Sequence, residues 1–152
     1  MKSINEWLNE YGESHQNHTN KIVHFICVPL IFFSIVGLLY SVKITHLFGF
    51  EITLAHIILV ILAIYYFLLS LPIAVGMVIY AAFCLMFCYL IEYNVGHLLA
   101  ISALIFIVAW IAQFYGHDIE GKKPSFLKDI QFLLIGPAWI MSFLLRKMNI
   151  SI

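Results

Sequence analysis

The chain has 152 residues, of which 63% are hydrophobic and 11% are charged, and its formal net charge is zero. A soluble domain is nearer half apolar and one quarter charged, and a domain of this size cannot bury so much apolar surface in water. The composition excludes an ordinary soluble enzyme, a disordered chain and a disulfide scaffold, and the balanced charge argues against nucleic acid as a partner. We therefore expect an integral membrane protein, folded as one domain over residues 1–152.

The charged residues are concentrated at the two ends of the chain. Between positions 22 and 116 the charged residues are only Lys43, Glu51 and Glu92. Burying charge in hydrocarbon is unfavourable, so this middle region is the part expected to lie in a membrane.

An amphipathic helix is predicted first, over Ser3–Tyr11. Ser3 and Glu6 have the spacing of a capping box at a helix start. Four apolar residues then fall on one stripe of the helix, namely Ile4, Trp7, Leu8 and Tyr11. Trp and Tyr are enriched at membrane interfaces, so this stripe is expected to face a membrane surface, the rest of the protein, or both.

Four long apolar segments follow, at residues 22–42, 52–71, 73–91 and 98–115. Each is close to the roughly 20 residues that cross a bilayer as a helix. Pro72 separates the second and third segments, which predicts a tight helical hairpin. A fifth apolar stretch, at 130–145, is shorter and contains Gly136-Pro137, so a short span, a re-entrant segment and an interfacial helix all remain open. The predicted fold is all-α: four transmembrane helices, the amphipathic helix and this short fifth helix.

The basic residues predict the orientation. With four crossings, the N-terminal segment and the 117–129 loop lie on one side, with Lys2, Lys21, Lys122, Lys123 and Lys128. In the loops on the opposite side, Lys43 is the only lysine or arginine. The positive-inside rule therefore places the first group in the cytoplasm, and Arg146 and Lys147 join it if the fifth segment turns back.

The same orientation sorts the seven histidines. The cytoplasmic group is His15, His18, His24 and His117, and the opposite group is His46, His56 and His97. Polar residues accompany the first group, since Asn20 and Gln113 lie one helical turn before His24 and His117. Asp118 and Glu120 follow directly.

Imidazoles beside carboxylates suit Fe(II), Zn(II) or another first-row metal. His15 and His24 are about half a turn out of phase on a continuous helix, so they can share a metal only if the chain bends between them. The turn-prone residues 16–20 allow such a bend. The alternative is that these histidines cap helix ends or lie among lipid headgroups.

Two strings in the sequence resemble those of a known family. The first is Tyr11-x3-His15-x4-Asn20-x3-His24-x4-Pro29, and the second is Trp110-x2-Gln113-Phe114-x-Gly116-His117-x2-Glu120-x3-Pro124. Gly136-Pro137 is similar to a third, weaker block. Together they resemble the family of the yeast endoplasmic-reticulum 2-hydroxy fatty acid dioxygenase, which acts in α-oxidation and has bacterial members. The resemblance extends over nearly the whole chain.

The resemblance implies an Fe(II)-dependent enzyme that uses O2 to shorten a 2-hydroxy fatty acid by one carbon. It implies His15, His24 and His117 as metal ligands, and Asn20, Gln113 and Glu120 as catalytic polar residues. Glu120 is expected either to bind the metal or to hold a ligand histidine. The implied location is a bacterial inner membrane, or the endoplasmic reticulum in a eukaryote, with the site on the cytoplasmic side.

The chemistry of the substrate agrees with this implication. A 2-hydroxy carboxylate can chelate Fe(II) through two oxygens, and three histidines leave positions for that chelate and O2. The acyl tail would lie among the apolar segments and membrane lipid. Lys21, Lys122 or Lys123 either attracts the carboxylate or only sets the topology.

Two other functions compete with this one. A di-iron membrane hydroxylase or desaturase needs the histidine boxes HxxxH and HxxHH, and neither occurs here. A non-enzymatic lipid-binding or scaffold protein would use the apolar segments and not the histidines. The oligomeric state and the length of the acyl chain do not follow from the sequence.

Overall fold

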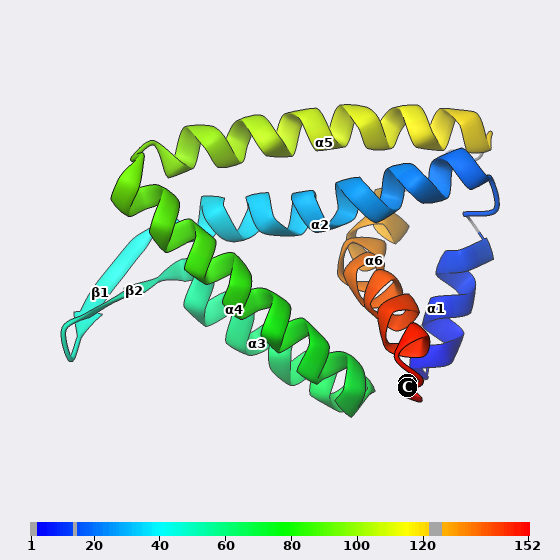
Figure 1. Cartoon of the computed structure of the whole chain (residues 1–152), viewed down its shortest axis with the longest axis horizontal. Helices are drawn as coiled ribbons and strands as arrows, with labels where there is room; N and C mark the ends of the chain where they lie inside the picture. Colours follow the sequence, from blue (N-terminus) through cyan, green and yellow to red (C-terminus); the bar gives the residue numbers. More distant parts are fainter. Residues whose placement is uncertain (1–2, 14, 122–125) are drawn as a thin grey trace.

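The computed structural model describes residues 3–13, 15–121 and 126–152. Within these residues the chain forms six helices and one two-stranded hairpin (Figure 1). The elements are α1 (Ile4–Glu13), α2 (His18–Tyr40), β1 (Lys43–Leu47), β2 (Phe50–Thr53), α3 (Leu54–Leu69), α4 (Leu71–Asn94), α5 (Leu98–Glu120) and α6 (Phe126–Lys147).

The amphipathic stripe of α1 packs against α6. Ser3 and Glu6 form the predicted capping box, because the Ser3 backbone N–H donates to Glu6 Oε2 at 2.7 Å and Glu6 N–H donates to Ser3 Oγ at 3.3 Å. The buried stripe joins one apolar cluster with α6, through Ile4, Leu8, Tyr11, Ile135, Ala138 and Trp139. The stripe is thus an internal packing surface, with Trp7 partly buried against the same cluster.

Helices α2 and α5 run side by side along the longest dimension of the molecule (Figure 1). Small residues allow their close approach. At Gly116, a Cβ atom would lie 2.6 Å from Asn20 Oδ1 and 3.2 Å from Val23 Cγ1. At Gly37, a Cβ atom would meet the Ser102 hydroxyl. The contact at Gly116 brings the start of α2 beside the end of α5.

Helices α3 and α4 form the hairpin that Pro72 predicts, with Pro72 in the first turn of α4. Two tyrosine hydroxyls attach this hairpin to the other helices. Tyr66 donates to the Leu134 carbonyl of α6 at 2.5 Å, and Tyr80 donates to the Pro29 carbonyl of α2 at 2.9 Å.

Three helices in the described part of the chain are long and apolar enough to cross a membrane, namely α2, α4 and α5. The second predicted span, α3, has 16 residues and is shorter than a typical span. The expected bundle of four transmembrane helices is therefore supported for three of them.

The expected all-α fold is confirmed by the six helices of the described residues, with one addition at residues 43–53. The expected loop at 43–51, together with the first residues of the predicted second span, forms the antiparallel pair β1–β2. Its residues alternate and include β-branched and aromatic side chains, which favour a strand over a helix.

Candidate metal centre

Three imidazole rings from distant parts of the sequence converge at one end of the α2–α5 pair. His15 follows α1, His24 lies in the second turn of α2, and His117 lies in the last turn of α5. One ring nitrogen from each lies within 4.8 Å of the others. Such a group can hold a metal ion, so the structure brings together the three residues that the family resemblance implies as ligands.

The break between α1 and α2 makes this convergence possible. Helix α1 ends at Glu13 and α2 begins at His18, with Asn17 as its N-cap. Asn17 Oδ1 accepts hydrogen bonds from the backbone N–H groups of Thr19 at 2.9 Å and Asn20 at 3.4 Å. Because the chain turns here, the His15 and His24 rings face each other, with centroids 4.1 Å apart.

Backbone carbonyls determine which nitrogens of these two rings carry a proton. His15 Nδ1 lies 2.6 Å from the Tyr11 carbonyl and His24 Nδ1 lies 3.0 Å from the Asn20 carbonyl. A carbonyl oxygen only accepts hydrogen bonds, so both Nδ1 atoms donate and both neutral rings present a lone pair at Nε2. The two Nε2 atoms face each other at 2.8 Å.

Two lone pairs at this distance repel each other unless a proton or a cation lies between them. Metal-bound histidines generally donate their other ring N–H to a carbonyl, carboxylate or water, which is the arrangement seen at both rings. Three neutral imidazoles are suitable donors for a first-row divalent ion such as Fe(II). The residues present therefore fit a metal centre.

The surroundings keep these rings neutral and dry. His15 and His24 are each only 2% exposed. Burial lowers the pKa of His15 below its ordinary value, although the hydrogen bond to Tyr11 opposes this effect. The Tyr11 ring stacks on His15 at a centroid distance of 4.2 Å, and Trp139 of α6 lies 5.7 Å from His15. His15 is thus available as a neutral ligand at pH 7.

The carboxylate of Glu120 ties the α1–α2 connection to the end of α5. Its oxygens accept hydrogen bonds from the backbone N–H groups of Gln16 at 2.9 Å and Asn17 at 3.0 Å. Asn20 Nδ2 donates to it at 2.9 Å. Glu120 is not part of the group formed by His15, His24 and His117. Its contacts hold the backbone between His15 and His24 in place.

Two buried side-chain carbonyl oxygens lie along the same α2–α5 contact. Asn20 is fully buried and Gln113 is 4% exposed, yet within the described residues Asn20 Oδ1 and Gln113 Oε1 accept no hydrogen bond. A buried acceptor without a donor is unfavourable, and native proteins rarely leave one unsatisfied. These two oxygens can accept a hydrogen bond from a hydroxyl group or water that enters the site.

The other histidines lie elsewhere. His18 is exposed at the start of α2. His46 lies on β1, His56 bonds Thr53 at the start of α3, and His97 precedes α5. Of the other residues singled out, Lys2, Lys122, Lys123 and Pro124 lie outside the described residues.

Sequence reasoning missed two parts of the site. Trp139 covers His15, and the only signal for it is its position shortly after Gly136-Pro137. The backbone donors of Gln16 and Asn17 have no sequence signal, because every non-proline residue carries an N–H group.

Known proteins resemble this chain over nearly its full length. Residues 1–148 match the family described as 2-hydroxy-palmitic acid dioxygenase Mpo1-like. The 2-hydroxy-palmitic acid dioxygenase MPO1 of Saccharomyces cerevisiae is 32% identical over 151 residues, which covers 98% of this chain and 83% of the yeast protein. No solved structure matches the chain.

Proposed function

The chain belongs to the Mpo1-like family of 2-hydroxy-palmitic acid dioxygenases, and from this membership we propose that it is an Fe(II)-dependent dioxygenase of 2-hydroxy fatty acids. It shortens the acyl chain by one carbon with O2. The observation that carries the proposal is the convergence of His15, His24 and His117, whose ligand atoms lie within 4.8 Å of one another.

The stoichiometry of the proposed reaction closes without another reductant. One 2-hydroxy acid and one O2 balance as the acid shortened by one carbon, one CO2 and one water. When bound by the three histidines, Fe(II) would supply a Lewis acid for the hydroxy acid and a redox centre through which electrons from the substrate reach O2. No 2-oxoglutarate is required.

The side chains around the histidines orient the substrate. Gln113 Oε1 and Asn20 Oδ1 are buried acceptors, so one of them can receive the hydrogen bond of the 2-hydroxyl group. A fatty acid without this hydroxyl leaves the acceptor unsatisfied, which is a strong basis for selection. Tyr11 and Trp139 cover His15 and exclude water from its face of the site.

The membrane supplies the substrate. Long-chain fatty acids partition into bilayers, and the outer faces of α2 and α5 beside the site are apolar and exposed, as at Ile22, Ile26, Ile111 and Phe114. We expect the carboxylate and hydroxyl groups to reach the histidines while the tail stays along these apolar faces.

Metal analysis and O2 uptake test the proposal directly. Protein purified anaerobically should hold about one iron per chain and consume O2 with 2-hydroxyhexadecanoate, releasing CO2 from its carboxyl carbon. Hexadecanoate should support no uptake. His117→Ala should lose both iron and uptake, because it removes a ligand from a three-histidine site.

The exposed His18 provides the matched control. His18→Ala removes an imidazole next to the site without touching the cluster, and it should keep wild-type iron content and O2 uptake. If His117→Ala keeps full iron content and activity, the metal assignment is wrong. If the wild-type protein holds no metal and consumes no O2, the non-enzymatic lipid-binding alternative gains support.

A further inference from the structure

The β1–β2 hairpin at the other end of α2 has one apolar face and one polar face. Across the hairpin, Leu47 pairs with Phe50 and Thr45 pairs with Ile52. Side chains of paired residues point to the same side and alternate along a strand, so these four residues share one face. The opposite face contains Lys43, His46 and Glu51.

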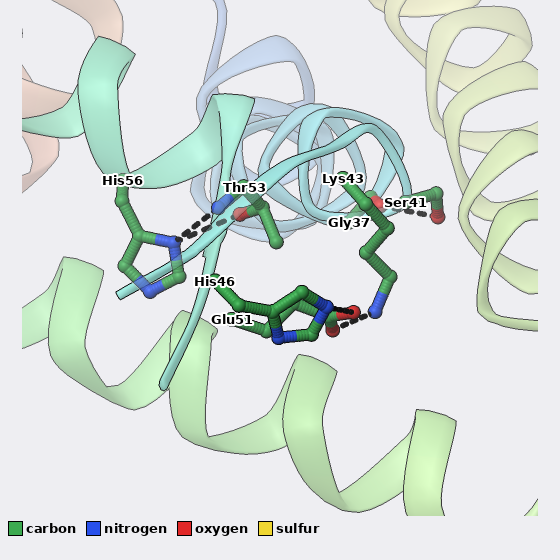
Figure 2. Close-up of polar contacts among 7 residues, drawn as sticks. All are labelled: Gly37, Ser41, Lys43, His46, Glu51, Thr53 and His56. Carbon is green, nitrogen blue, oxygen red and sulfur yellow. Dashed lines mark hydrogen bonds and ion pairs between the residues drawn. The ribbon is translucent and has the colours of Figure 1, made fainter. Parts of the chain in front are cut away.

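The side chains of this second face contact one another through polar groups (Figure 2). Lys43 forms an ion pair with Glu51, and His46 Nε2 lies 3.7 Å from Glu51 Oε1. Because Lys43 and Glu51 compensate each other, the hairpin carries no excess charge when His46 is neutral. A partner that binds this element is therefore recognised through apolar contact and not through charge.

The apolar side of the hairpin is uncovered. Phe48 in the turn is 90% exposed, Phe50 is 74% exposed and Leu47 is 53% exposed. Figure 1 shows the hairpin projecting from the helices at the end of α2 opposite to α1. Exposure of large apolar side chains to water is unfavourable. Two neighbouring exposed phenylalanines on a projecting element therefore indicate a contact surface.

The location of the hairpin identifies what covers it. It begins three residues after the end of α2, a helix that is long and apolar enough to cross a membrane. Trp and Tyr are enriched where such helices leave the bilayer, and amphipathic helices that lie in this interface bury Phe and Leu there. The outer edges of a two-stranded hairpin carry unpaired N–H and C=O groups, which are too unfavourable in hydrocarbon. In the headgroup region, water and lipid headgroups can form hydrogen bonds with the strand edges, while the apolar side chains reach the acyl chains.

We propose that the β1–β2 hairpin is a membrane-interface anchor: Phe48, Phe50 and Leu47 insert at the boundary of headgroups and acyl chains, in the leaflet away from the histidine cluster. Its partner is the lipid of the same bilayer. The polar face of Lys43, His46 and Glu51 points to water. This inference does not depend on the proposed enzymatic activity.

Spin labels on single cysteines test the anchor in the full chain, in phosphatidylcholine vesicles. Cys27, Cys84 and Cys88 are replaced by alanine, and a label is placed at Phe48, Phe50 or His46. Labels at 48 and 50 should be relaxed more by O2 than by a water-soluble nickel complex, at a depth of roughly 5–10 Å below the headgroup surface. The label at 46 is the control and should show the reverse ratio.

Adding anionic phosphatidylglycerol should leave these ratios unchanged, because the hairpin has no excess charge to attract it. Equal nickel accessibility at 48 and 46 would place the hairpin in water and overturn the proposal. Immobile labels at 48 and 50 that neither reagent reaches would also overturn it, in favour of a second copy or another protein as the partner.

Discussion

Gln113 combines burial with an unsatisfied acceptor. Within the described part of the chain its Oε1 receives no hydrogen bond, although the side chain is only 4% exposed. Such a group lowers the stability of the folded protein, because an unpaired buried acceptor costs about 1–3 kcal/mol. Its presence is explained if a substrate hydroxyl or a water donates to it during function.

Gln113→Leu should therefore separate stability from activity. The apolar side chain has nearly the same size, so the melting temperature should stay equal or rise, while kcat/KM for a 2-hydroxy acid should fall at least about tenfold. Thermal unfolding and O2 uptake measure the two effects. Ser102 is the control, because its buried hydroxyl is also unsatisfied but faces Gly37 farther along α5. A loss of activity in Ser102→Ala equal to that in Gln113→Leu would contradict a specific role.

We expect Glu120 to act through the backbone that it holds. Glu120→Gln replaces one acceptor oxygen with an NH2 group that faces the N–H donors of Gln16 and Asn17. We expect iron affinity or activity to fall about 10–100-fold while remaining measurable, as for residues that orient metal ligands. Asp118→Asn is the matched control, because Asp118 is exposed two positions earlier. A loss as complete as that of His117→Ala would mean that Glu120 binds the metal directly.

At the level of the helices, the start of α2 and the end of α5 must stay close for the histidines to meet. Gly116 lies at this contact, where a Cβ atom would be 2.6 Å from Asn20 Oδ1. Asn20 is fully buried, and its backbone carbonyl oxygen accepts a hydrogen bond from His24 Nδ1. It therefore has little freedom to move. Helix separation here would displace His117 from His24.

Gly116→Ala should therefore impair both folding and metal binding. Overpacking of a dense contact costs about 1–3 kcal/mol, and the displaced α5 should also lower iron content. Gly12→Ala is the control, since its Cβ would lie at an ordinary 3.5 Å from Trp139 Nε1. Denaturation and iron analysis of both variants check the prediction. Normal iron content in Gly116→Ala would show that the contact tolerates expansion.

Hydropathy predicted the helices well in their middles and poorly at their ends. The apolar run of the fourth segment stops at 115, whereas α5 continues to Glu120, and α2 begins at His18 and not at 22. The site residues Asn20, His117 and Glu120 lie in these polar extensions, because a helix continues through polar residues once its core turns are fixed. Apolar content alone therefore locates the spans but does not predict the helical ends on which the site residues lie.

The hairpin escaped prediction for a different reason. Residues 43–53 are too few to cross a membrane as a helix, and Ile52 is also the first residue of the second apolar segment. The signal is the alternation of Thr45 and Leu47 with His46 between them, directly before Phe48-Gly49. Both turn residues have positive φ, 51° and 82°, as a two-residue hairpin turn of type I′ requires.

For the whole molecule, the two ends of the α2–α5 pair have different surroundings. One end contains the histidines, Glu120 and the cover formed by α1 and α6. The other end leads into the hairpin. Contact of Glu120 with Gln16 and Asn17 requires the start of α2 and the end of α5 to lie on the same side of any membrane that the pair crosses.

The two sides of the membrane on which these ends lie can be distinguished by labelling. From the basic residues we expect the histidine end to lie in the cytoplasm and the hairpin to lie on the opposite side. In a variant whose three native cysteines are replaced by alanine, cysteines at Lys2 and Lys122 should react with an impermeant maleimide only from the cytoplasmic side. A cysteine at His46, which is 75% exposed on the polar face of the hairpin, should react only from the other side. Reaction of positions 2 and 122 from opposite sides would rule out an even number of crossings between them, and reaction of all three positions from one side would show that α2 does not span the bilayer.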